Sequence, residues 1–251
     1  MLTKRIIACM DVRDGNVVKG VQFQQLRHAG DPAELAARYN VEGIDEVVIL
    51  DITATLESRR ALADTIHAVA QRIFLPLTVG GGIRSEDDAA AAVDAGADKV
   101  SLNTAALKNP ELITTLARRY GSQAVIVAID AKRRGDGFAV YVRSGTADAA
   151  RDAVEWAREA EARGAGEILL TSMDRDGTLS GFDCQMTAAV GNAVNIPVIA
   201  SGGAGGAEHF CEVFTRGCAD AALAASIFHS GSVRVSDLKH YLRRQQIPVR
   251  L

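Results

Sequence analysis

Ile6-Ile7-Ala8-Cys9-Met10-Asp11 is the stretch that decides the fold of this chain, because its pattern occurs twice. An apolar run ending in a carboxylate returns as Val125-Ile126-Val127-Ala128-Ile129-Asp130. Three more pairs of segments follow in the same order and at nearly the same offset: 43–50 with 164–171, 75–82 with 196–203, and 96–100 with 218–222. The chain is therefore predicted to consist of two equivalent halves, about 1–120 and 121–251, so that a functional group in one half should have a counterpart in the other.

The composition is that of an ordinary globular protein. Of 251 residues, 48% are hydrophobic and 24% are charged, and the net charge of −3 argues against nucleic acid or an anionic membrane as the main partner. No apolar run approaches the ~18 residues of a membrane span, and no signal peptide is evident. The four cysteines lack metal or redox spacing. We expect a cytoplasmic protein with reduced cysteines.

Short apolar runs alternate with amphipathic stretches along the whole chain, which is typical of repeated βα units. The predicted strands are 5–11, 46–51, 76–80, 98–103, 124–130, 167–172, 197–201 and 220–225. The predicted helices are 32–43, 58–72, 85–95, 109–119, 148–163, 184–194, 206–217 and 235–245. Eight of each favour a closed α/β (β/α)8 barrel, the TIM barrel, as a single domain over residues 1–251.

Two loops that follow strands are longer than the others, residues 12–31 and 131–147. In the second, Gly135-Asp136-Gly137 indicates a small hairpin. Loops of this kind lie at the C-terminal end of a barrel, here called the mouth, where substrates bind.

Asp11 and Asp130 each end an apolar strand. If odd positions of the first strand point inward, both carboxylates stand at the mouth, on strands half a barrel apart. Two such carboxylates can divide acid and base work if one is protonated and the other ionised. The alternative is that each only caps a turn or pairs with a nearby lysine.

Glycine-rich turns end the third and seventh strands, at 80–82 and 201–203. Asn103-Thr104 and Ala225-Ser226 end the fourth and eighth, and Ser226 begins a predicted short helix. Glycines let a backbone approach a phosphate, and N–H groups at a helix start receive its charge. We therefore predict a ligand with a phosphate at each end, although each turn alone could be only a tight turn. Lys19 could close over this ligand or be a solvated lysine.

Charged residues sit at the opposite end of the barrel, here called the base. They are Arg5, Glu46, Lys99 and Glu167, all predicted to point inward. Together they would form a neutral polar plug with a path for a small molecule; the alternative is a set of salt bridges at the rim. Asp176, in the loop after the sixth strand, is a plausible hydrogen-bonding partner of the ligand. No metal motif and no cofactor motif are visible, so no cofactor is expected.

Several of these motifs in combination resemble the cyclase subunit of imidazole glycerol phosphate synthase. They are 5–12, 15–20, 78–83, 121–133 and 200–205, and the resemblance runs from about residue 2 to 251. It implies a barrel enzyme of histidine biosynthesis whose substrate is the phosphoribulosyl-formimino form of aminoimidazole carboxamide ribonucleotide, a bisphosphate. It also implies a glutaminase partner on the base, whose ammonia crosses the barrel. The products would be imidazole glycerol phosphate and aminoimidazole carboxamide ribonucleotide.

The resemblance assigns roles residue by residue. Asp11 and Asp130 match the catalytic acid–base pair, and Asp98 lies on the face that meets the glutaminase. Arg5, Glu46, Lys99 and Glu167 match the ammonia gate. The substrate and phosphate contacts expected are Lys19, Gly82, Asn103, Thr104, Thr171, Asp176, Gly177, Gly203, Ala225 and Ser226.

Two other functions stay open at this point. One is the sister aldose–ketose isomerase, because residues 176–181 resemble that enzyme, and Val21 and Leu179 replace more polar residues of the cyclase pattern. The other is a barrel that only binds a phosphorylated metabolite, which the two intact aspartates argue against.

Overall fold

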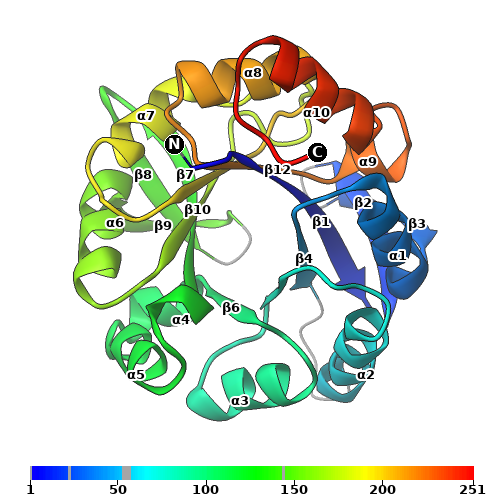
Figure 1. Cartoon of the computed structure of the whole chain (residues 1–251). Helices are drawn as coiled ribbons and strands as arrows, with labels where there is room; N and C mark the ends of the chain where they lie inside the picture. The colour runs from blue at the N-terminus through cyan, green and yellow to red at the C-terminus, as the bar shows by residue number, and fades with distance from the viewer. Residues whose placement is uncertain (1, 22–23, 53–57, 143–144) are drawn as a thin grey trace.

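A computed structural model describes residues 2–21, 24–52, 58–142 and 145–251. Eight parallel strands close into a barrel, because the last strand pairs with the first and the fifth with the sixth (Figure 1). In order around the barrel they are β1 (Arg5–Arg13), β4 (Glu46–Asp51), β5 (Leu77–Gly80), β6 (Lys99–Leu102), β7 (Val125–Arg134), β10 (Glu167–Ser172), β11 (Val198–Ser201) and β12 (Ala221–Ala224). The predicted (β/α)8 barrel is confirmed.

Helices surround the strands on the outside (Figure 1). They are α1 (Pro32–Glu42), α2 (Ser58–Ala70), α3 (Glu86–Asp94), α4 (Thr104–Lys108), α5 (Glu111–Tyr120), α6 (Ala153–Ala162), α7 (Cys184–Gly191), α8 (Ala207–Thr215), α9 (Ser226–His229) and α10 (Val235–Arg244), with a 3-10 turn η1 at Ser122–Ala124. In the described part of the chain, none of these helices has the length and apolar character needed to cross a membrane.

The alternation of side chains along each strand separates two apolar layers. On β1, Ile7 and Cys9 face the barrel interior, whereas Ile6, Ala8 and Met10 pack under the helices. The interior layer consists of Ile7, Cys9, Val48, Ile126, Leu169, Ile199, Ala221 and Leu223. The inward orientation predicted from strand parity is therefore confirmed, and it directs Asp11 toward the mouth interior.

Aspartates secure the base of the barrel by accepting hydrogen bonds from backbone N–H groups of the neighbouring strand. Asp45 accepts from Ile6 N (2.8 Å), Asp98 from Leu77 N (2.8 Å) and Asp220 from Val198 N (3.1 Å). Lys239 of α10, almost fully buried, donates to Asp45 Oδ1 at 2.7 Å. This pair joins the last helix to the start of the barrel.

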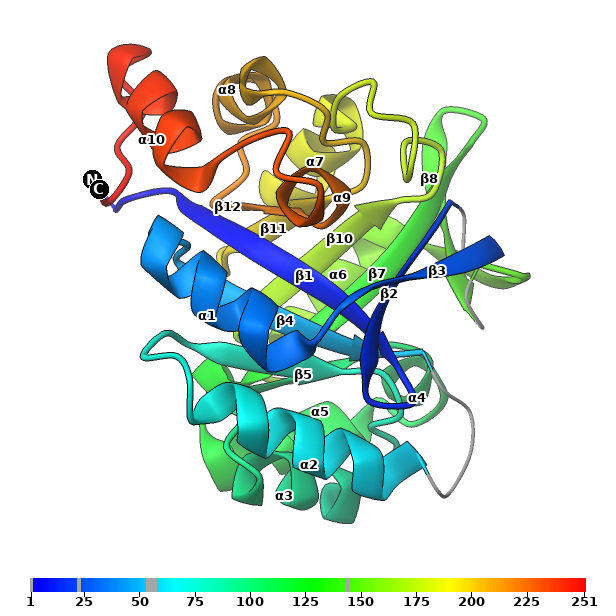
Figure 2. The ribbon, with the colours of Figure 1, turned by 90° about the vertical axis from the view of Figure 1, so that its right-hand side faces the viewer.

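The structure differs from the predicted elements beside the mouth. Two antiparallel extensions lie at the end of the barrel opposite the chain termini (Figure 2): β2 (Asn16–Val21) with β3 (Gln24–Gly30), and β8 (Gly137–Val142) with β9 (Ala147–Asp152). The Gly135–Gly137 hairpin is confirmed by β7–β8 pairing. The predicted helix 148–163 begins too early, because residues 148–152 pair with β8 and the Asp152 side chain caps α6 at 153.

Candidate functional site

The two aspartates lie at the mouth on opposite sides of the barrel. Asp11 is near the end of β1, and Asp130 is at the corresponding place on β7, four strands away around the ring. Leu50 of β4 stands beside Asp11 in register, and Thr171 of β10 stands beside Asp130. The sequence prediction of two inward carboxylates on opposite strands agrees with this geometry.

Both aspartates have raised pKa values. Burial in the barrel and, to a smaller extent, the neighbouring carboxylate of Asp176 together raise the pKa of Asp11 from its ordinary 3.8 to about 6. Burial likewise raises the pKa of Asp130 to about 6; a hydrogen bond from Asn103 opposes this rise and the charge of Asp176 adds to it. Carboxyl groups with such pKa values exchange protons close to neutral pH, as acid–base catalysis needs.

Asp176 is a third carboxylate at the mouth, close enough to act electrostatically on both aspartates. It lies in the loop after β10, where its backbone N–H donates to Ser172 O at 2.9 Å. Burial raises its pKa, and a hydrogen bond from the Gly177 backbone opposes this rise. The sequence predicts Asp176 as a possible ligand contact. Its electrostatic effect on both other carboxylates could not be predicted, because loop conformation has no periodic signature.

Glycine-rich loops end β5 and β11, at 80–82 and 201–203. In each loop the middle residue is a glycine, and it lies against the end of the neighbouring strand. A Cβ on Gly81 would lie 2.0 Å from Asp51 O, and a Cβ on Gly202 would lie 2.6 Å from Ser172 O. Both residues also have left-handed φ values, +77° and +90°. Only glycine fits these two places. The predicted contacts Gly82 and Gly203 come directly after them, at the mouth.

A short helix begins beside each glycine loop. Thr104 starts α4 and Ser226 starts α9, and the residues before them, Asn103 and Ala225, make no side-chain cap. Their backbone angles are similar, φ −123° and ψ −103° at Asn103 against φ −120° and ψ −73° at Ala225. The confirmed helix at Ser226 and its partner at Thr104 therefore leave first-turn N–H groups without a side-chain cap on both sides of the mouth.

The remaining predicted contacts are placed as follows. Thr171 lies on the inner face of β10, and Gly177 follows Asp176 with a φ of +73°. Lys19 lies in β2, opposite Arg27 of β3, in the extension beside the mouth. Leu179 is half exposed in the loop after β10. Val21 ends β2.

At the base, Arg5, Glu46, Lys99 and Glu167 form a closed ring of alternating charges, here called the charge ring. Arg5 Nη1 contacts Glu46 Oε1 at 2.5 Å and Glu167 Oε1 at 3.0 Å. Lys99 Nζ contacts the same two oxygens, each at 3.1 Å. Burial works against the charge of Arg5, but the two glutamates together raise its pKa. Glu46 and Glu167 are buried, so these pairs are not the solvated rim bridges of the alternative interpretation.

Two buried hydroxyl side chains lie between the charge ring and the mouth. Thr78 is in register with Lys99, and Ser101 follows Lys99 on the same face of β6. Within the described residues, Thr78 Oγ1 has no hydrogen-bond partner. Neither residue was predicted as a site residue, although the parity that places Lys99 and Asn103 on one face also places Ser101 there.

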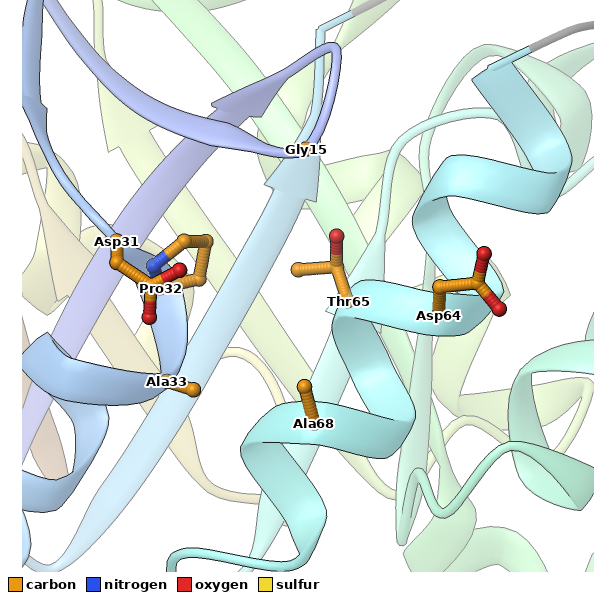
Figure 3. A pocket seen from close by; sticks show the side chains of 7 residues that line it. All are labelled: Gly15, Asp31, Pro32, Ala33, Asp64, Thr65 and Ala68. Carbon is orange, nitrogen blue, oxygen red and sulfur yellow. The ribbon is translucent and has the colours of Figure 1, made fainter.

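A pocket of about 340 Å³ lies outside the barrel, between the start of α1 and the middle of α2 (Figure 3). It is lined by Gly15, Asp31, Pro32, Ala33, Asp64, Thr65 and Ala68. Asp31 and Asp64 lie on its two sides (Figure 3), so its charge does not suit a phosphorylated ligand. No predicted site residue lines it. Among the described residues, no group of His, Cys, Asp and Glu side chains could hold a metal ion.

Comparisons with known proteins identify the family of the chain. Residues 5–234 match the family model described as "Histidine biosynthesis protein". The chain is 63% identical to imidazole glycerol phosphate synthase subunit HisF of Acidobacterium capsulatum, over 100% of this chain and 99% of the relative. It is 60% identical to HisF of Solibacter usitatus, over 100% and 99%, and 56% identical to HisF of Metallosphaera sedula, over the full length of both. This similarity identifies the chain as a cyclase subunit. It excludes the sister isomerase and a barrel that only binds a phosphorylated metabolite. The chain belongs to the HisF family, the cyclase subunit of imidazole glycerol phosphate synthase, an enzyme of histidine biosynthesis.

Proposed function

We propose that Asp11 and Asp130 are the acid–base pair of the cyclase reaction, which joins ammonia to the phosphoribulosyl-formimino aminoimidazole carboxamide ribonucleotide. The observation that carries the proposal is the pair of buried carboxyl groups on opposite sides of one mouth, each with its pKa raised to about 6. Near neutral pH each group can gain or lose a proton without a large free-energy cost.

The reaction needs such a pair because every step moves protons. When ammonia adds to the ketone, the carbonyl oxygen gains a proton and the nitrogen loses one. One carboxyl group can supply the first proton while the other, as a carboxylate, accepts the second. Later cleavage of the amidine-type C–N bond and closure of the imidazole ring again require a donor and an acceptor, and the products are imidazole glycerol phosphate and aminoimidazole carboxamide ribonucleotide.

The two ends of the mouth provide matching anion sites for a bisphosphate. In this proposal the first phosphate lies on Gly82, Asn103 and Thr104, and the second on Gly203, Ala225 and Ser226. The starts of α4 and α9, where Asn103 and Ala225 form no side-chain cap, support it, because the N-terminus of a helix favours a bound phosphate. Lys19, Thr171, Asp176 and Gly177 would contact the middle of the substrate. The proposal includes no cofactor.

The base is proposed as the docking face for a separate glutaminase subunit and as the entrance for its ammonia. The charge ring closes the centre of this face, so it would act as the ammonia gate. Around it, Leu2, Val41, Phe74 and Leu251 are exposed large apolar side chains, Phe74 to 96%. They lie at the end where the chain termini meet, which favours a protein partner there. Asp98, exposed on the same face, would contact that partner.

The two halves, about 1–120 and 121–251, are proposed to be equivalent units of one barrel. Corresponding aspartates, glycine loops and short helices occupy corresponding places in them. The tight contacts of Gly81 and Gly202 with a neighbouring strand are the clearest structural parallel.

The test replaces each aspartate in turn by asparagine and measures turnover of the bisphosphate with ammonium as the nitrogen source. Asp11→Asn and Asp130→Asn should each lower kcat by orders of magnitude while substrate still binds in a calorimetric titration. Asp64→Asn, an exposed aspartate on α2, is the matched control and should keep its activity. Turnover at the unmodified rate in either mouth variant would refute the assignment.

A further inference from the structure

The two halves of the site differ at one side chain. Asn103 Nδ2 donates a hydrogen bond of 2.9 Å to Asp130 Oδ2, and this hydrogen bond is partly buried. Asparagine directly before a helix ordinarily caps its first turn, but Asn103 makes no such cap on α4. Its amide is directed at Asp130 instead.

The counterpart of Asn103 in the other half is Ala225. It occupies the same place before the short helix α9, and its side chain packs against the inner apolar layer of the barrel. Ala225 directly follows β12, which pairs with β1, as Asn103 directly follows β6, which pairs with β7. Beside Asp11, the Ala225 side chain therefore offers only a methyl group, at the place where the Asn103 side chain offers an amide donor to Asp130. Within the described part of the chain, the Asp11 side chain accepts no hydrogen bond.

We propose that Asn103 breaks the symmetry of the pair: its amide holds Asp130 as the carboxylate, so that Asp11 is the member that carries the proton at the start of the reaction. This rests on the acid–base function proposed above. In the addition step, the proton of Asp11 passes to the carbonyl oxygen of the substrate. A proton of the added nitrogen passes to Asp130, and Asp11 is left as the carboxylate. Asn103 is thus a positioning residue that acts through Asp130.

The other groups around the pair agree with this difference. Asp176 raises the pKa of both aspartates, so the direction of its effect is the same at each. Beside Asp130 in register are Thr171 of β10 and Tyr141 of β8, both hydroxyl side chains. Beside Asp11 are the apolar Leu50 of β4 and Val18 of β2. Cys9 lies one inward position before it on β1, where burial, and after it the charges of Asp11 and Asp176, raise the pKa of the thiol. Hydrogen-bonding groups favour the ionised form of a carboxyl, and apolar neighbours favour the neutral form.

The experiment is a 13C NMR titration of the two aspartate carboxyl groups in the full chain, with signals assigned from the Asp11→Asn and Asp130→Asn variants. We expect Asp11 to titrate at the higher pH. Asn103→Ala should raise the pKa of Asp130 by about 1, a tenfold change in its dissociation constant, with little change at Asp11. Ala225→Asn should lower the pKa of Asp11, and the double exchange Asn103→Ala/Ala225→Asn should reverse the order. Asn195→Ala, an exposed asparagine before β11, is the control and should change neither.

Two results would overturn the inference. One is a higher pKa at Asp130 than at Asp11 in the unchanged protein. The other is a lower pKa of Asp130 in Asn103→Ala, which would mean that the amide oxygen accepts a hydrogen bond from the O–H of a neutral Asp130. In Asn103→Ala, the pH profile of kcat with ammonium should move to higher pH together with the pKa of Asp130. A purely structural role of Asn103 would not cause this movement. If the inference fails while the proposed function holds, the pKa order is wrong but both aspartate-to-asparagine variants still lose turnover. If those variants keep their turnover, the proposed function itself fails.

Discussion

Replacing Asp11 by asparagine is predicted to stabilise the protein while it abolishes turnover. Burial raises the pKa of this carboxyl from 3.8 to about 6, so the folded protein retains a proton that the unfolded chain has already lost. Stability then falls as pH rises between these two values. The rise in pKa corresponds to about 3 kcal/mol at pH 8, where the carboxylate is fully charged in both states.

The asparagine variant removes this cost, although its amide must still be buried. We therefore expect a gain of about 2 to 3 kcal/mol at pH 8, or a rise in Tm of about 4 to 12 °C for a chain of this size. At pH 3.5, where the carboxyl is protonated in both states, the gain should largely vanish. Asp130→Asn should behave similarly but gain less, because its amide loses the favourable interaction of the carboxylate with Asn103.

The assay is urea unfolding followed by circular dichroism at several pH values, with Asp64→Asn as the control. The stability difference between Asp11→Asn and the unchanged protein should grow from pH 4 to pH 7, and the control should show no such growth. If Asp11→Asn is no more stable than the unchanged protein at pH 8, the claim that the ionised Asp11 carboxylate destabilises the folded protein is refuted.

Three further predictions follow from other parts of the structure. Lys99→Ala opens the charge ring and leaves Glu46 and Glu167 with Arg5 alone, so glutamine-dependent activity with the partner should change more than ammonium-dependent activity; equal changes would argue against a gate. Gly81→Ala should cost clearly more stability and turnover than Gly43→Ala, because both have left-handed φ values but only Gly81 lacks room for a Cβ, and equal losses in thermal unfolding would contradict this. Lys239→Met removes the cation at 2.7 Å from the buried Asp45 carboxylate and leaves it with Arg250 at 3.5 Å and the N–H of Ile6, so unfolding should require about 3 kcal/mol less. An unchanged denaturation midpoint would refute the role of the Lys239–Asp45 pair.

Strand parity and the internal repeat were sufficient to predict the barrel and the charge ring. Each of the eight strands is an apolar run whose side chains alternate between the barrel interior and the helices. The inward direction of Lys99 or Glu167 can therefore be deduced without coordinates. The charges at the base then meet because every strand starts at the same end of the barrel.

The rest depends on contacts that no local pattern records. Residues 148–152 have a helix-forming composition but become strand β9 because they pair with β8. The pairing of β2 with β3 likewise depends on an extension of β1 beyond Asp11. Asp176, which acts electrostatically on both Asp11 and Asp130, lies in a loop. The hydrogen bond from Asn103 to Asp130 joins the ends of two neighbouring strands. These are the features that tune the site chemically.

The most direct test of the account is a crystal structure of the Asp130→Asn variant with the bisphosphate substrate. We predict that one phosphate lies at the start of α4 and the other at the start of α9, with the ketone carbon between residues 11 and 130. A substrate bound outside the barrel, or within it but with its ketone away from both side chains, would contradict the account.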